Sequence, residues 1–327
     1  MSKKILYVVH RYAPFPGGSE NYVRNMAEET LSRGHEVWVL AGEHKGDLNG
    51  VRVTKNPFIL MRRWDLIVVH GGDLPVQKNF VVRLALENAK RLPSPMLLML
   101  IIPSESRIYQ RAIQAVKYIG CSTKEDWELV KSNNLLPKSV QIRHGIDERV
   151  SVGLPGFREK YGIKTKYMFL SCGGYWPNKA MRELVNLFNQ VAREDITLVL
   201  TGYDNRYNLM PEESEFVKPL MIDNRDDVIS AISEADLYIM HSHREGFGLV
   251  LLESMLNKTP WAARNLAGAK LMNEFGLAYD VDEQLLDYMR DFNSFPQRQV
   301  EDAYAYITSN HLIQNTVDDV LKLALAS

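Results

Sequence analysis

The sequence has little cysteine and no long apolar run. Only Cys121 and Cys172 occur among 327 residues, and they form neither a disulfide framework nor a CxxC metal pair, which favours a reducing compartment. No apolar stretch reaches the roughly 18 residues that a membrane span requires. The apolar run at residues 5–9 is too short for the core of a signal peptide. We therefore expect a soluble, cytoplasmic protein.

An excess of charge of one sign is also missing, because 39 Lys and Arg stand against 40 Asp and Glu. Residues 1–150 nevertheless carry 22 basic and 15 acidic residues (+7), which leaves 17 basic and 25 acidic residues (−8) for the remainder. One interpretation is that the basic half meets an anionic acceptor or the surface of a membrane. The other is that the two halves attract each other, since no block of five like charges occurs. We expect no nucleic-acid partner.

The chain is long for a single hydrophobic core, and its pattern repeats the order strand, helix, strand in each half. We predict strands at 5–9, 36–41, 66–70 and 96–102 and helices at 20–32, 76–90, 109–118 and 124–133. In the second half we predict strands at 167–172, 197–201 and 237–241 and helices at 179–192, 226–234 and 248–257, with two tail helices within 297–326. The aperiodic stretch 144–162 is the candidate linker.

These patterns predict an α/β protein with two Rossmann-like, doubly wound domains that face a cleft. The first domain spans 1–150 and the second 151–300, and the tail helices of about 300–327 are candidates for packing back on the first. Ligands of such sheets bind beyond the carboxyl ends of the strands, where helix N-termini point outward.

The segment from Glu245 to Glu253 carries the strongest chemical signal. Two carboxylates lie eight positions apart, and Gly246, Phe247 and Gly248 between them precede a predicted helix. Free backbone N–H groups at a helix start favour an anion such as phosphate. Carboxylates accept hydrogen bonds from the hydroxyls of a sugar or ribose. The segment therefore predicts a site for a phosphorylated, polyhydroxylated ligand.

The Glu-x7-Glu pair with an internal Gly-Phe-Gly resembles the signature of family 4 retaining glycosyltransferases of the GT-B fold. The resemblance implies that Glu253 binds the ribose of a nucleotide-sugar donor and that Glu245 is catalytic, orienting the sugar while the diphosphate departs. It implies no cofactor and no metal.

Two glycine-rich loops match the same family in the same chain order. Gly17 and Gly18 follow the first strand and resemble the family's N-terminal glycine loop. Gly173, Gly174 and Lys179 follow the first strand of the second half and resemble the element whose lysine neutralises the donor diphosphate. These residues complete the predicted donor site.

Two departures from the family concern charge and acid–base chemistry. The family usually has an arginine five residues before its lysine, where this chain has Gly174, so Arg182 or Arg264 is a candidate substitute. Many members also place a histidine after the strand near 96–102, and this chain offers Ser104 or Glu105 instead.

The resemblance implies a metal-independent glycosyltransferase that uses a nucleotide-diphosphate-sugar and an unknown carbohydrate, lipid-linked or protein acceptor. The departures keep open a catalytically impaired nucleotide-sugar-binding protein, and a nucleotide-sugar epimerase of the same architecture is the other alternative. A metal triad of His241, His243 and Glu245 has poor spacing for zinc. In the pair Asp280-x-Asp282, we expect Asp282 to cap a helix rather than to bind a metal ion.

Overall fold

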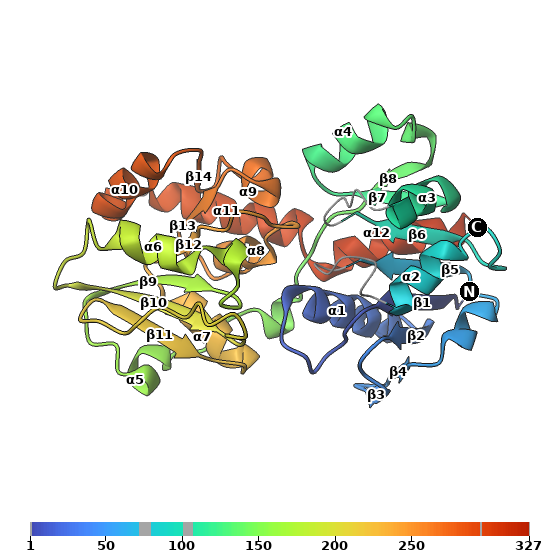
Figure 1. The fold of residues 1–327 in the computed structure, drawn as a ribbon, viewed down its shortest axis with the longest axis horizontal. Helices are drawn as coiled ribbons and strands as arrows, with labels where there is room; N and C mark the ends of the chain where they lie inside the picture. Colours follow the sequence, from blue (N-terminus) through green and yellow to red (C-terminus); the bar gives the residue numbers. More distant parts are fainter. Residues whose placement is uncertain (1, 72–79, 101–106, 295, 327) are drawn as a thin grey trace. The chain divides into compact units, whose positions relative to one another are not determined.

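The computed structural model describes residues 2–71, 80–100, 107–294 and 296–326. Within these residues the chain forms two compact units. Met1–Ile146 and His311–Ser327 make up the first unit, and Asp147–Asn310 make up the second (Figure 1).

The described part of the first unit holds an eight-stranded sheet with the order β3-β4-β2-β1-β5-β6-β7-β8. Its strands pair in parallel, except that β3 runs antiparallel to β4. The strands are β1 (Lys4–Val9), β2 (Glu36–Ala41), β3 (Gly46–Leu48), β4 (Val51–Thr54), β5 (Leu66–His70), β6 (Met96–Met99), β7 (Tyr118–Cys121) and β8 (Ser139–Gln141). The helices are α1 (Gly18–Ser32), η1 (Pro57–Met61), α2 (Phe80–Glu87), α3 (Arg107–Ala115), α4 (Lys124–Ser132), η3 (Leu136–Lys138) and α12 (Ile313–Leu325).

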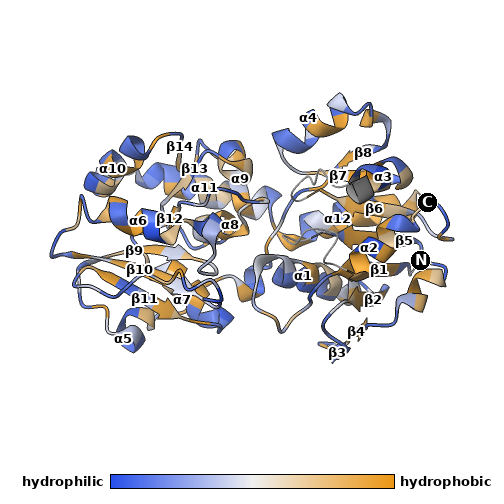
Figure 2. Cartoon of the chain, in the orientation of Figure 1, coloured by the Kyte–Doolittle hydropathy of each residue, from blue (hydrophilic) through white to orange (hydrophobic). Residues whose placement is uncertain are grey.

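The central strands of this sheet are almost entirely apolar and are buried, because helices cover both faces. All five residues of β5 are buried, as are the four residues of β6. This is the pattern of a parallel sheet, in which alternation of polar and apolar residues is lost. In Figure 2 the strands around β5 and β6 are mostly coloured hydrophobic, whereas a covering helix such as α4 shows hydrophilic residues.

Helix α12 returns to the first unit and packs against α1. The return is fixed by a short parallel bridge between Ile146 and Leu312, with hydrogen bonds in both directions across it. A Cβ atom on Gly145 would collide with the carbonyl oxygen of Leu312. Only glycine therefore allows the two chain segments to approach this closely.

The described part of the second unit holds a six-stranded, parallel sheet with the order β11-β10-β9-β12-β13-β14. Its strands are β9 (Tyr167–Cys172), β10 (Ile196–Gly202), β11 (Val217–Met221), β12 (Leu237–Met240), β13 (Trp261–Arg264) and β14 (Leu277–Tyr279). Its helices are η4 (Glu148–Val150), α5 (Phe157–Tyr161), η5 (Pro177–Lys179), α6 (Met181–Phe188), α7 (Arg225–Glu234), α8 (Leu249–Leu256), α9 (Ala267–Leu271), α10 (Asp282–Arg290), η6 (Phe292–Ser294) and α11 (Gln297–Asn310).

The predicted fold class is confirmed, since each unit is a parallel sheet with crossover helices. Several strands, among them β2, β5 and β9, have the predicted bounds. The helix predicted at 109–118 is wrong at its end, because α3 stops at Ala115 and Tyr118 already opens β7. The helix predicted at 179–192 begins only at Met181, after a turn in which Ala180 has a positive φ, and it ends at Phe188. The first part of the helix predicted at 76–90 and the end of the strand predicted at 96–102 lie outside the described residues.

Candidate donor-binding site

The predicted residues of the second half gather where β9 and β12 end. These strands are direct neighbours and run parallel, so their carboxyl ends meet at one edge of the sheet. The loop from Gly173 to Lys179 follows β9, and the loop from His241 to Gly248 follows β12. The two loops are joined by a backbone hydrogen bond from His243 N to Asn178 O of 2.8 Å. The fold therefore brings together elements that are about 65 residues apart in sequence.

Lys179 and Glu245 form an ion pair at this edge. Lys179 Nζ donates to Glu245 Oε1 at 2.7 Å, and the two side chains are only 20% and 11% exposed. Such a pair is stronger than one on an open surface, because water screens it less. The predicted phosphate-binding cation and the predicted catalytic carboxylate thus contact each other directly.

Glu253 has a cation of its own. It is the fifth residue of α8, and its carboxylate accepts a hydrogen bond from Arg225 at the start of α7. The side chain of Glu253 is 9% exposed and that of Arg225 is 28% exposed. Arg225 is not among the site residues predicted from the sequence. A basic residue in the first turn of a helix opposes the helix dipole, and this was the signal that could have found it.

Cys172 and Tyr238 lie close enough to both ion pairs to be affected by their charges. The Cys172 thiol contacts the Tyr238 hydroxyl at 3.6 Å. Burial raises the pKa of Cys172 to about 11; the nearby Glu253 raises this pKa further, while Lys179 and Arg225 lower it. Burial also raises the pKa of Tyr238 well above its ordinary value, with smaller contributions from Cys172, Glu245 and Glu253. All four charged groups therefore act on one small region.

The glycine loop after β9 is shaped by close contacts to its own side chains. Gly173 has a φ of +144°, and a Cβ there would lie 3.1 Å from Lys179 Cε. A Cβ on Gly174 would lie 2.5 Å from Cε2 of the Trp176 indole, so a larger residue requires that indole to move. Trp176 Nε1 in turn donates to Asp204 Oδ2 at 3.2 Å. The tryptophan therefore stands beside the position at which the family has its arginine.

The loop before α8 also makes close backbone contacts, in this case with Gly268. Gly248 caps α8 with a φ of +86°. Gly268 N donates to the carbonyl oxygen of Phe247 at 3.1 Å, and a Cβ on Gly268 would collide with that oxygen. The predicted residues Gly246, Phe247 and Gly248 thus form a fixed turn that leads into the helix carrying Glu253.

Neither candidate substitute for the missing arginine contacts the two glutamates. Arg182 donates to the carbonyl oxygen of Asn208 at 2.8 Å. Arg264 contacts His241 Nε2 at 2.8 Å and Asp282 at 3.3 Å. Both guanidinium groups are therefore engaged elsewhere in the second unit.

The residues considered for a metal triad have three different partners. His241 is buried and lies 2.6 Å from the Tyr279 hydroxyl, and burial lowers its pKa to about 4. His243 is exposed and pairs with Glu183 at 2.8 Å, while Glu245 pairs with Lys179. Within the described part of the chain, no three His, Cys, Asp or Glu residues are placed to hold a metal ion.

The glycine loop of the first unit lies at the carboxyl end of β1. Gly17 has a φ of +154° and precedes α1, whose first residue is Gly18. The Glu20 carboxylate folds back over Gly17 and forms an ion pair with Arg11 at 2.9 Å. This loop belongs to the first unit and the two glutamates to the second. Ser104 and Glu105 lie outside the described residues.

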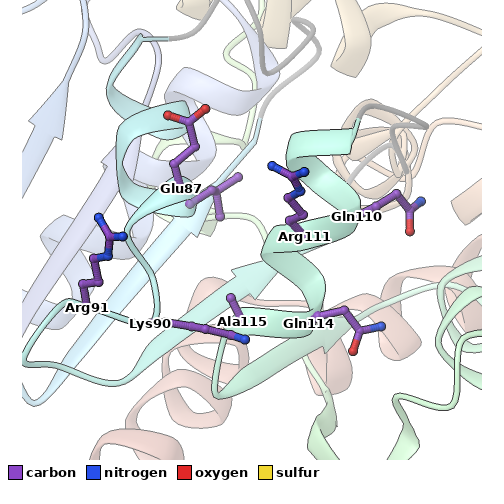
Figure 3. Close-up of a pocket in the computed structure, with 8 residues that line it drawn as sticks. Glu87, Lys90, Arg91, Gln110, Arg111, Gln114 and Ala115 are labelled. Carbon is purple, nitrogen blue, oxygen red and sulfur yellow. The ribbon is translucent and has the colours of Figure 1, made fainter.

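A separate cavity of about 620 Å³ lies between α2 and α3 of the first unit. Figure 3 shows Glu87 of α2, Lys90 and Arg91 of the following turn, and Arg111 of α3 around it. It is lined by exposed cations and amides, and the predicted site residues are not part of its lining.

Part of the chain is similar to a known protein family. Residues 155–275 match the family model described as "Glycosyl transferases group 1". Over 213 residues the chain is 25% identical to N-acetyl-alpha-D-glucosaminyl L-malate synthase of Bacillus anthracis. That match covers 58% of this chain and 54% of the relative, so the chain matches about half of the length of this curated relative.

Solved structures of similar fold cover the whole chain. Sucrose-phosphate synthase from Thermosynechococcus elongatus superposes with a TM-score of 0.79 at 13% identity, covering 99% of this chain and 98% of that one. HepE of Anabaena in complex with UDP and glucose gives 0.78 at 16% identity, covering 99% and 100%. Among the described residues no helix has the length and apolar character needed to cross a membrane. The chain therefore has the two-unit fold of these solved structures, and its residues 155–275 are similar to the group 1 glycosyltransferases.

Proposed function

We propose that the protein transfers a sugar from a nucleotide-diphosphate-sugar to an acceptor hydroxyl, as a family 4 enzyme that retains the anomeric configuration. The observation that carries this proposal is the Lys179–Glu245 pair at the carboxyl ends of β9 and β12, with Glu253 beside it. It supports a site that has a cation for phosphate and two carboxylates for hydroxyls. The UDP and glucose bound by HepE are consistent with such a donor.

In the proposed reaction the bond between the anomeric carbon and the diphosphate breaks, and a bond to the acceptor oxygen forms. The acceptor's hydroxyl proton is released, and the nucleoside diphosphate leaves. Lys179 and the N–H groups at the start of α8 stabilise the charge that develops on the leaving diphosphate. Glu245 orients the sugar and Glu253 accepts hydrogen bonds from the ribose. The proposed reaction uses these groups alone and assigns no role to a cofactor or a metal ion.

A thermal-shift panel of UDP, GDP and ADP and of their glucose conjugates, run with EDTA, tests the donor. A ligand that binds the native state increases the free energy of unfolding by about 2.7 kcal/mol at a hundredfold excess over Kd, and the unfolding midpoint rises as a result. We expect one base to raise the midpoint and the shift to persist in EDTA.

A shift that disappears with EDTA would contradict metal-independent binding, and no shift with any nucleotide would contradict the donor site. Turnover distinguishes the remaining alternatives. Binding without products across many acceptors indicates a nucleotide-sugar-binding protein, and a new sugar nucleotide formed without acceptor indicates an epimerase.

We further propose that the protein acts in the cytoplasm and contacts an anionic membrane surface through η1 of the first unit. Phe58 and Met61 are 78% and 64% exposed there, whereas their neighbours Ile59 and Leu60 are buried. Residues 48–64 contain four Lys and Arg and no acidic residue. Exposed apolar side chains among cations are typical of surfaces that bind the interface of anionic membranes.

Sedimentation with lipid vesicles tests this contact. We expect the protein to sediment with vesicles that contain phosphatidylglycerol more than with pure phosphatidylcholine, and high salt should weaken the binding. The double variant F58D/M61D should lose it. The variant L136D, which changes an exposed leucine of the same unit, is the matched control. Equal sedimentation of wild type and F58D/M61D would exclude η1 as the contact.

A further inference from the structure

Arg225 binds the carboxylate of Glu253, one of the two glutamates of the Glu-x7-Glu segment. It is the first residue of α7, a helix capped by the Asn224 side chain, which accepts from Asp226 N at 2.9 Å. Arg225 Nη2 donates to Glu253 Oε1. Because the cap fixes the helix start, the guanidinium approaches Glu253 from a defined direction.

The pair leaves free hydrogen-bonding capacity on both partners. In the described part of the chain, Glu253 Oε2 has no protein donor, and Arg225 Nε is buried without an acceptor. A carboxylate accepts through both of its oxygens, so Oε2 can take a hydroxyl while Oε1 stays with the arginine. A buried carboxylate without a partner would be costly, and the pair therefore holds the Glu253 carboxylate in one orientation.

The other cations considered for the donor site contact other groups. Lys179 pairs with Glu245, and Arg182 and Arg264 contact other groups. Arg244 is exposed in the same loop as Glu245, and only its backbone carbonyl has a contact to the β9 loop, from Asn178 Nδ2 at 3.4 Å. Glu245 thus pairs with Lys179, and Glu253 pairs with Arg225.

We propose that Arg225 is a positioning residue for nucleotide recognition: it fixes Glu253 so that Oε2 accepts a ribose hydroxyl, which makes the site selective for ribonucleotides. This inference is based on the proposed function, because it assumes that Glu253 faces the donor's ribose. It assigns Arg225 to recognition of the ribose, whereas the proposed function assigns the diphosphate to Lys179.

Isothermal titration calorimetry with the nucleoside diphosphate that stabilises the wild type, and with its 2′-deoxy and 3′-deoxy forms, tests the proposal. A hydrogen bond to a charged acceptor corresponds to about 10- to 100-fold in affinity. We expect the wild type to prefer the ribonucleotide by about that factor over at least one deoxy form. R225A should bring the ratio close to one, and R225K should restore part of it. R244A, which removes a nearby arginine, should keep the wild-type ratio.

Three other outcomes would contradict either the proposed function or the positioning role of Arg225. If the wild type binds no nucleoside diphosphate, the proposed function fails, and this inference with it. If the wild type binds and R225A weakens ribo and deoxy ligands equally, Arg225 has only a structural role. If R244A abolishes the preference as R225A does, general charge rather than positioning is responsible. R225Q keeps a donor for Glu253 without the charge, and it replaces R225A in the same measurement should that variant not fold.

Discussion

Replacing Glu245 by glutamine is expected to lower kcat about 10²- to 10³-fold, the range seen when one preorganised electrostatic group is removed from an active site. The same change should leave the affinity for the nucleoside diphosphate unchanged or increase it. The reason is the ion pair of 2.7 Å between Glu245 and Lys179, in which the carboxylate occupies the cation. Without that carboxylate, Lys179 is available to the diphosphate.

Kinetics with the identified donor, together with calorimetry of the diphosphate, separate these two effects. E183Q is the matched control. Glu183 lies on the neighbouring helix α6 and pairs with the exposed His243. E183Q should have wild-type kcat and affinity. A full kcat in E245Q would exclude a catalytic role for Glu245, and a large loss of diphosphate affinity would show that its carboxylate supports donor binding instead.

Replacing Lys179 by alanine is expected to weaken nucleoside diphosphate binding about 10- to 100-fold and to leave the bare nucleoside unaffected. A charge-assisted hydrogen bond of this kind is worth about 1.5–3 kcal/mol. The loss should be largest at low salt, because screening weakens the lysine's attraction for phosphate in the wild type. Since Gly174 offers no side chain, the site has few other cations to compensate.

Calorimetry of the nucleoside and the diphosphate, each at low and high salt, measures this difference. K258A is the matched control, because Lys258 pairs with Glu301 on the surface of the same unit. K179A also leaves Glu245 without the lysine of its ion pair, so the folding of K179A is checked by thermal unfolding. An equal loss for the nucleoside and the diphosphate would contradict a phosphate role for Lys179.

The sequence was sufficient for several inner strands and for the position of the Glu245–Glu253 segment relative to α8. Strands such as β5 and β9 are continuous apolar runs between polar loops, and this pattern gives their bounds directly. The Glu-x7-Glu segment placed both glutamates correctly around the start of α8, because local spacing determines which residues enter the helix.

The short edge strands could not be predicted in the same way. β3, β8 and β14 each have three residues, which is too short for a period of two to be recognised. The end of α3 was also missed, since Val116 and Tyr118 suit a helix as well as a strand. Their assignment depends on the pairing of β7 with β6, which is a tertiary effect.

The ion-pair partners of Glu245 and Glu253 could not be predicted from the sequence for a different reason. Arg225 and Glu253 are 28 positions apart, and Lys179 and Glu245 are 66 apart. Their meeting requires the order of strands in the sheet, which a single sequence does not provide. From the family pattern we predicted that Arg182 or Arg264 replaces the missing arginine. In the structure, Arg182 contacts Asn208 and Arg264 contacts His241 instead.

The return of α12 to the first unit has a consequence for the order of synthesis on the ribosome. Residues 147–310 are continuous in sequence, so the second unit can fold as soon as it has left the ribosome. The surface of α1 that receives α12 must wait for these 164 residues, about 8–33 s at roughly 5–20 residues per second. During that interval the first unit exposes apolar surface that α12 later covers. The chain is therefore most vulnerable to chaperone capture and aggregation in its first half, although that half is made first.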